Sequence, residues 1–456
     1  MNKTKQIIIL IALHFGCICL AQQTPYLPMP KAASMPNYST QTNSNHINRG
    51  ISNQSDLFNQ ITERTQRQNE ITIQKANYNI GQSAIQRQAK KEAEADILAL
   101  RPSINYSLPS WASHTGTEYY FQAFDKLLLS DSLYSLKENT FLIENAFFNN
   151  QLDKSAFDQT INNCRTFLIS IMKERGYDLN SNTVKNLVLF QFFSETLQLK
   201  KSKEKHLPFQ YDFDDYMGIK DHSKMFITKL LKTGTGQCHS MPLLYLILAN
   251  EIGAEAYLSL SPNHSYIRFP DDNGKWYNIE LTNGMFSTTS YILQSGYIKS
   301  EALQNKIYMQ NLSRKELMAQ QLVDLAQGYI RKFGYDEFIA EIITKALQLH
   351  PNSINANMIK ANLDTARFQY VMKQLNINPL DTKQLQQIGY FPKAVELLNM
   401  VNEQYNTVDN LGYEPMPAEA YQKWLQAMKN TEQKQENDRI QKMFNGLNAK
   451  AKTLHD

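Results

Sequence analysis

Apolar residues recur at three- and four-residue spacing through two long stretches of the chain. The first stretch, from Glu118 to about Lys205, has successive apolar faces that predict several helices. The second stretch, 313–350, has an apolar face on each side of Gly334, which predicts two helices joined by a turn. A third helix is expected over 353–375. Helices therefore dominate both halves of the chain.

The pattern between these stretches is different. An apolar run that ends at Gly253 is hydrophobic nearly all round, which is typical of a buried helix. Three segments with strand character follow it. The turn signal Pro270-Asp271-Asp272-Asn273-Gly274 separates the second from the third. The predicted class is therefore α+β, and the expected strands span 254–261, 264–269 and 275–281.

The turn also predicts how the last two strands pair. If 270–274 is a five-residue loop, Phe269 lies opposite Lys275, and the same register places His264 opposite Glu280. Directly opposed residues share a face of the sheet, with Cβ atoms about 4.5–5.5 Å apart. The expected product is a His–carboxylate pair on one hairpin.

Cys238 stands at the start of the buried helix. Gly234 and Gly236 precede it, and Pro242 is compatible with a helix only within its first turn. The helix therefore begins close to Cys238, where the helix dipole and unpaired N–H groups stabilise a thiolate. A thiol that faces a base, which is itself oriented by a carboxylate, is the arrangement of a catalytic triad.

Three further residues are candidates for this site. An amide substrate needs donors for its developing oxyanion, and we expect the Cys238 backbone N–H to be one. The Gln237 side chain is either a second donor or a cap for the loop. Tyr266 and Trp276 either line a substrate groove or belong to the core.

The order of Gly-x-Gly-x-Cys, apolar helix, strand, His strand, turn and acidic strand resembles the transglutaminase-like cysteine-catalysis fold. The likeness is good over about 220–290 and loose over about 115–310. It implies a transglutaminase-like (papain-like) core in which Cys238 is the nucleophile, His264 its base and Glu280 the residue that orients the base. The run from Gln237 to Tyr245 further resembles a bacterial branch in which this core precedes tetratricopeptide-like repeats.

Two positions depart from the family pattern. The family usually has Asp where this chain has Glu280, and it usually has Trp two residues after the histidine, where Tyr266 stands here. Since Glu is one methylene longer, we expect a different orienting geometry. The resemblance implies acyl transfer or hydrolysis on a protein or peptide amide, with no cofactor and no metal.

The ends of the chain complete the predicted organisation. A basic start, a short apolar run and Ala21 before a polar stretch are typical of a signal peptide, which predicts export to the periplasm, the cell surface or the medium. Of the four cysteines, cleavage there would leave only Cys164 and Cys238. The predicted parts are a signal peptide (1–21), a low-complexity linker with a Gln-rich helix (22–100), the transglutaminase-like domain (101–312), a helical-repeat region (313–430) and a charged helix (431–456).

Composition narrows the function classes. The chain has 456 residues, and 47 basic against 43 acidic side chains give a net charge of +4 without a basic block, so nucleic acid is not an expected partner. Hydrophobic residues make up 42%, which excludes a wholly disordered chain. Two hypotheses stay open: a thiol acyl-transfer enzyme or peptidase, and an inactive envelope scaffold that binds a protein through its helical repeats.

Overall fold

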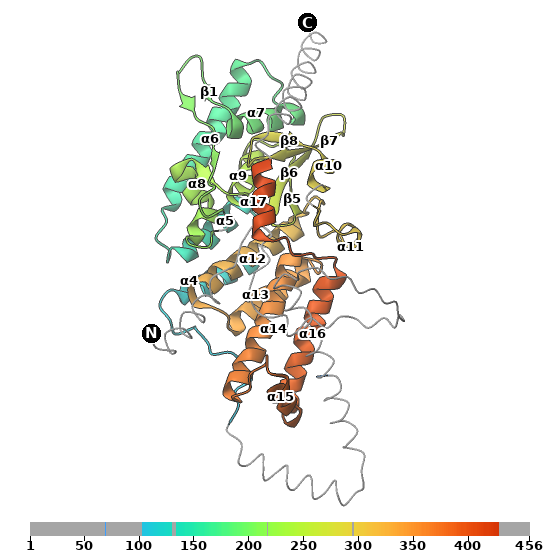
Figure 1. Cartoon of the computed structure of the whole chain (residues 1–456). Coiled ribbons are helices and arrows are strands. Elements are labelled where there is room, and N and C mark those ends of the chain that lie inside the picture. Colours follow the sequence, from blue (N-terminus) through green and yellow to red (C-terminus); the bar gives the residue numbers. More distant parts are fainter. Residues whose placement is uncertain (1–68, 70–102, 130–133, 217, 294–295, 428–456) are drawn as a thin grey trace, which may run out of the picture.

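The computed structural model describes residues 103–129, 134–216, 218–293 and 296–427, together with Asn69. The predicted signal peptide, nearly all of the predicted linker and Gln-rich helix, and the predicted C-terminal helix lie outside these residues. The described part mixes helices with a small amount of sheet, as the predicted α+β class requires. Figure 1 shows the sheet among helices in the upper part of the view and a group of helices below it.

Four helices form the N-terminal part, which precedes the sheet. Their polar starts explain where three of them begin, because Ser135, Asp153 and Ser181 each accept a hydrogen bond from a backbone N–H of the first turn. The helices are α4 (Thr117–Leu129), α5 (Leu136–Phe147), α6 (Lys154–Glu174) and α7 (Asn182–Ser194).

The predicted helical stretch ends earlier than expected. Helix α7 stops at Ser194, and the residues up to about 205, expected to be helical, instead form a short hairpin of β1 (Leu197–Gln198) and β2 (Lys205–His206). The reason is that buried positions no longer recur at the helical spacing: Leu197 and Leu199 are buried and the residue between them is exposed, which suits a strand. The elements between this hairpin and the central helix are β3 (Gln210–Tyr211), η1 (His222–Met225), α8 (Ile227–Thr233) and β4 (Thr235–Gly236).

The central helix α9 (Ser240–Glu251) and an antiparallel sheet follow one another in the chain. The sheet has the strand order β5-β6-β7-β8, which is also the sequence order. Three strands match the predicted segments, and the fourth, which follows Asn283-Gly284, was not predicted. The strands are β5 (Tyr257–Ser261), β6 (His264–Pro270), β7 (Trp276–Glu280) and β8 (Met285–Ser287), and two short helices follow, α10 (Thr289–Leu293) and α11 (Ser300–Gln304).

The C-terminal helices include those expected from the two-helix pattern. A capping box between Ser313 and Glu316 starts the first of them, and Gly334, with a positive φ, ends it. The elements are α12 (Arg314–Phe333), α13 (Glu337–Leu349), α14 (Ile354–Gln374), α15 (Thr382–Leu385), η2 (Gln386–Tyr390), α16 (Pro392–Asn410) and α17 (Ala418–Ala427).

The predicted boundary at 312 does not separate two cores. Helix α12 packs against α4 and α5, where Tyr329 meets the ring of Tyr120 at 5.4 Å. The Gln321 amide group, also on α12, bonds to Thr140 and to the carbonyl of Leu136. One hydrophobic cluster therefore runs from the N-terminal helices through α9 and the sheet to α14, and a second lies between α14 and α16.

Candidate active site

Local backbone geometry brings Cys238 to the start of α9, as predicted. The helix begins at Ser240, two residues after the cysteine. Gly236 is required before it, because a Cβ there would lie 2.8 Å from the Ser240 hydroxyl and 2.9 Å from a Leu230 methyl. Gly253, with φ +67°, follows the last turn. The predicted start and end of this buried helix are therefore confirmed.

Pro242 has a second consequence for the site. It stands where a helical N–H would bind the Cys238 carbonyl, and proline has no N–H to donate. That carbonyl instead accepts a hydrogen bond from the hydroxyl of Ser265 on β6. The residue beside His264 thus connects the cysteine backbone directly to the histidine strand.

The hairpin has a different register from the predicted one. Ile267 lies opposite Ile279 and Phe269 opposite Tyr277, so the pairing is shifted by two residues. The cause is the turn, where Asp271 and Lys275 still pair through their backbones while the Asp271 carboxylate accepts the N–H groups of Asn273 and Lys275. The loop is therefore shorter than the predicted five residues.

This correction preserves the predicted pair, because a shift of two residues leaves every side chain on the same face. Continued past Ile267, the register makes His264 and Glu280 diagonal neighbours rather than direct opposites. Diagonal neighbours are about 7–8 Å apart, which is a longer span than for opposed residues. The extra methylene of Glu280 suits that span, and its Oε2 lies 2.6 Å from His264 Nε2. The Thr282 N–H holds the other carboxylate oxygen at 3.0 Å.

The structure thus brings the three predicted triad residues to one place. His264 directs Nε2 at Glu280 and Nδ1 towards the cysteine side of the site. The Tyr421 hydroxyl lies 3.1 Å from His264 Nδ1 and 3.3 Å from Cys238 Sγ. All three predicted residues are buried: Cys238 is 4% exposed, His264 1% and Glu280 5%.

The electrostatics of this cluster favour an ion pair. Burial raises the pKa of the Cys238 thiol, but the hydrogen bond and positive charge of His264 outweigh it, so the net pKa is lowered. Burial lowers the pKa of His264, yet the Glu280 charge and the Cys238 hydrogen bond raise it to about 10. The arrangement therefore stabilises a thiolate beside an imidazolium, the reactive state of a cysteine nucleophile.

Gln237 is placed as a loop cap. Its side-chain amide donates to the backbone carbonyls of Asp212, at 2.9 Å, and Asp215, at 3.4 Å. Its backbone N–H donates to the Ser240 hydroxyl at 2.9 Å. Because the amide protons point at the 212–215 loop, the side chain is not directed at an oxyanion next to Cys238. Of its two predicted roles, these contacts agree with the cap.

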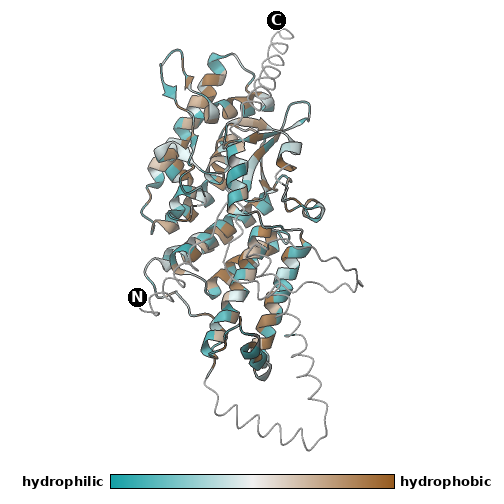
Figure 2. Cartoon of the chain, viewed as in Figure 1, coloured by the Kyte–Doolittle hydropathy of each residue, from teal (hydrophilic) through white to brown (hydrophobic). Residues whose placement is uncertain are grey.

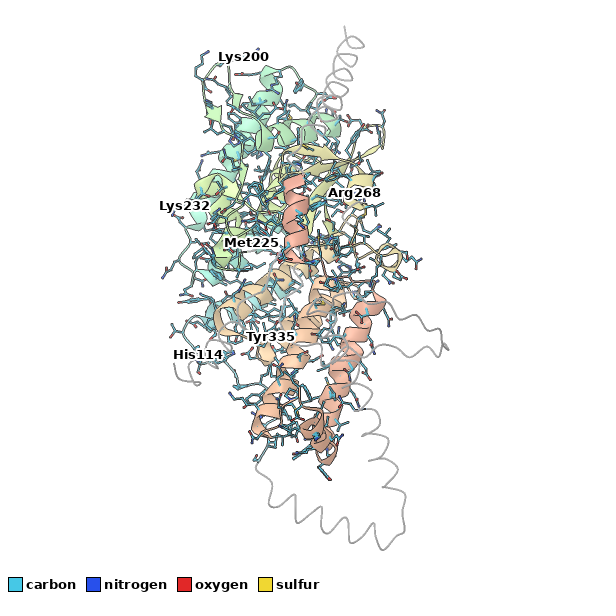
Figure 3. All side chains as sticks on the ribbon, in the orientation of Figure 1. His114, Lys200, Met225, Lys232, Arg268 and Tyr335 are labelled. Atoms are coloured by element: carbon cyan, nitrogen blue, oxygen red, sulfur yellow. The ribbon has the colours of Figure 1, made fainter. Side chains whose placement is uncertain are left out.

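The two aromatic candidates do not form a groove around the triad. Tyr266 shares the face of His264 but is 1% exposed, and burial raises its pKa to about 12. Trp276 is 42% exposed but lies four residues along β7 from Glu280, about 13 Å of strand. It contacts Tyr257 and the guanidinium of Arg268, which is labelled in Figure 3. Tyr266 therefore packs inside the fold, and Trp276 lies at the far end of the hairpin.

Two aromatic residues at the site were not predicted. Tyr421 and Trp424 come from α17, and the Trp424 ring meets the His264 ring edge-on at 4.9 Å. Their spacing of three residues puts both on one helix face. That spacing is the only signal in the sequence, and it does not indicate which part of the chain this face contacts.

His239 points away from the triad. Its Nδ1 lies 3.0 Å from the carbonyl of Met225, and its Nε2 lies 3.1 Å from an Asp324 carboxylate oxygen on α12. Burial lowers the pKa of His239, but the Asp324 charge raises it to about 9. The residue next to the candidate nucleophile is thus a charged link to α12.

No group of three His, Cys, Asp or Glu side chains in the described ranges is placed to hold a metal ion. No helix in this part of the chain has the length and apolar character needed to cross a membrane. Comparison of the chain with protein-family models, with curated proteins and with solved structures found no match.

Proposed function

We propose that this chain is an exported, transglutaminase-like cysteine enzyme that transfers the acyl group of a protein or peptide amide. The observation that carries the proposal is the placement of His264, which contacts Glu280 through Nε2 while its Nδ1 and the Cys238 sulfur both contact the Tyr421 hydroxyl. A base oriented by a carboxylate and paired with a thiol is what nucleophilic catalysis by cysteine requires. The Gly-x-Gly-x-Cys motif and the order of the helix and strands support the same family.

The reaction follows from these three side chains. The Cys238 thiolate forms a bond to the amide carbonyl carbon, and the C–N bond breaks as His264 gives its proton to the leaving nitrogen. Glu280 keeps the imidazole oriented and stabilises its charge. Water or a primary amine then attacks the thioester, His264 accepts its proton, and the S–C bond breaks to restore the thiolate. The first acceptor gives hydrolysis and the second gives transamidation.

The chemistry can be tested with an activated acyl donor, 4-nitrophenyl acetate. Two full-length proteins are compared: the Cys164→Ser variant, and the same variant with Tyr421→Ala added. The second substitution removes the hydroxyl that contacts both Cys238 and His264. We expect an acetyl thioester on Cys238, detected by peptide mass mapping together with nitrophenolate release. His264→Ala should slow its formation about 100-fold, the lower end of general-base contributions. Addition of methylamine then distinguishes transamidation from hydrolysis by the product formed.

A second function is favoured by the burial of the site. With Cys238 and His264 nearly inaccessible, the chain also suits an inactive scaffold that binds a protein partner through α12–α16. The same experiment separates the two. Absence of acylation in both the Tyr421 and the Tyr421→Ala proteins, or acylation that does not depend on His264, rejects the enzyme and leaves the scaffold.

A further inference from the structure

Helix α17 returns to the active site after the chain has passed through the C-terminal helices. Tyr421 contacts a cysteine that precedes it by 183 residues. Figure 1 shows α17 in front of α9 and the β5–β6 side of the sheet, whereas α16, the helix before it, lies in the lower group. A segment that no sequence pattern connects to the triad thus lies against it.

Helix α17 contacts the two atoms that react in the proposed mechanism, the cysteine sulfur and a ring nitrogen of the histidine. The Tyr421 hydroxyl is within hydrogen-bond distance of both Cys238 Sγ and His264 Nδ1. Trp424 covers the His264 ring and stacks on Tyr421, with ring centroids 5.8 Å apart. A substrate carbonyl must reach Cys238 Sγ, and its leaving nitrogen must reach the imidazole. The hydroxyl occupies this position, and the two rings close the space around it.

We propose that α17 is an intramolecular lid, which inhibits the enzyme by holding the Tyr421 hydroxyl against both Cys238 Sγ and His264 Nδ1 and opens to admit substrate. The inference rests on the proposed function, because a lid has a purpose only over a reactive thiol. It also reconciles two observations that otherwise conflict: the triad has an activating geometry, yet it is almost fully buried.

The segment before α17 has contacts of its own with the rest of the fold. We call residues 411–416 the anchor segment. Gly412 in it lies so close to α11 that a Cβ there would be 2.3 Å from the Ala302 nitrogen. Asn263 donates to the Met416 carbonyl at 3.0 Å. The anchor segment is thus held against the loop between β5 and β6 and against α11.

The lid itself is attached along one face. Tyr421 is buried and Trp424 half-buried, whereas Glu419, Gln422 and Lys423 are exposed. The side of α17 seen in Figure 2 is accordingly mostly hydrophilic. A ten-residue helix is too short to be stable alone, so its helical form depends on this contact. Displacing two aromatic side chains would release α17 from Pro417 onward and leave the anchor segment in place.

Thiol modification of the full chain tests the lid. In the Cys164→Ser background, we would compare the alkylation rate of Cys238 by iodoacetamide at neutral pH with and without Tyr421→Ala and Trp424→Ala. If the open state is a minor population of about 1–10%, the double variant should react about 10- to 100-fold faster. Lys423→Ala, an exposed change on the same helix, is the matched control and should not alter the rate. If Cys238 is alkylated at the same rate with and without the Tyr421→Ala and Trp424→Ala substitutions, the lid is overturned.

A second measurement does not depend on substitution. Once Cys238 of the otherwise unaltered protein is carbamidomethylated, the added group has no room beside Tyr421, and α17 must leave the site. Hydrogen exchange of the 418–427 amides should then increase, while exchange in α14 stays unchanged. Unchanged exchange over 418–427 after full modification overturns the lid even if the double variant misfolds.

Failure of the lid and failure of the proposed function have different signatures. If the enzyme is real but α17 is not a lid, Cys238 reacts equally fast with and without the two aromatic side chains, and His264→Ala slows both. If α17 covers an inert thiol, the double variant exposes Cys238, but its alkylation follows an ordinary thiol titration that His264→Ala does not change. The second outcome rejects the enzyme and, with it, an inhibitory role for α17.

Discussion

Cys164 and Cys238 both contact the main hydrophobic cluster, yet their surroundings give them opposite acid–base behaviour. Cys164 lies within α6, where burial raises the pKa of its thiol to about 11. Cys238 is buried more deeply, but its pKa is lowered because His264 and Tyr421 contact it. Burial alone therefore makes a thiol inert, and a partner from another element is needed to reverse the effect.

The largest expected effect comes from removing that partner. In His264→Ala, burial and the nearby Glu280 charge still raise the pKa of Cys238, and the Tyr421 hydrogen bond is left to oppose them. The thiolate fraction at neutral pH should fall at least about 100-fold, which corresponds to two pH units. Thiolate ultraviolet absorbance against pH measures this without any access to the site. Cys238→Ser shows which part of the absorbance comes from Cys238. If His264→Ala leaves the Cys238 titration unchanged, His264 is not the cause of the difference between the two cysteines.

The next largest effect is a loss of stability when the ion pair between His239, at the start of α9, and Asp324 on α12 is broken. Asp324 raises the pKa of His239 to about 9, above its usual value near 6.5. The pair therefore stabilises the fold fully below about pH 6.5, and this stabilisation is lost as the pH rises through 9. Asp324→Asn should lower the free energy of unfolding by about 2 kcal/mol at pH 6, as for a lost charged hydrogen bond.

At pH 10 the same substitution should cost much less. Urea denaturation at the two pH values provides the comparison. Lys345→Ala on α13, a half-buried residue outside this pair, serves as the control. A loss of stability that is equal at both pH values would contradict a charged His239.

A smaller effect is expected from neutralising the Glu280 carboxylate. In Glu280→Gln, burial still disfavours the imidazolium, while the largest favourable interaction, the Glu280 charge, is removed. His264 should release its proton about one pH unit lower, equivalent to about 1.4 kcal/mol. NMR of the labelled histidine ring against pH measures this shift.

Glu280→Asp is the informative companion variant. It keeps the charge but shortens the side chain across a diagonal pair, so the shift should be partly retained while the hydrogen bond lengthens. If Glu280→Asp behaved like the unaltered protein, the longer side chain would not be a consequence of the hairpin register.

The smallest effect is expected at the other cysteine. Cys164 is half-buried on α6, and Cys164→Ser replaces one small side chain with another, so the loss of stability should stay below about 1 kcal/mol. The Cys238 titration should not move. A shift in the Cys238 titration would show that the two thiols influence each other, so their pKa values could not be compared independently.

Local rules were enough for much of the site. Glycines before Cys238, a proline tolerated only in the first turn and Gly253 at the end predicted α9 correctly, because each acts within a few residues. The face shared by His264 and Glu280 was also predictable, since it depends on whether the register changes by an even or an odd number of residues. The register itself was not, because the Asp271 carboxylate organises the turn through hydrogen bonds that composition does not reveal.

The sequence by itself determined the start of the helix that follows Cys238, the two strands that carry His264 and Glu280, and the mixed helical and sheet class. The tertiary structure alone decided that α12 shares a core with the N-terminal helices and that α17 covers the triad. The physical reason is the range of the interactions. Helix starts and strand faces follow from neighbours in the chain, whereas the contact of Tyr421 with Cys238 depends on the packing of every helix between them.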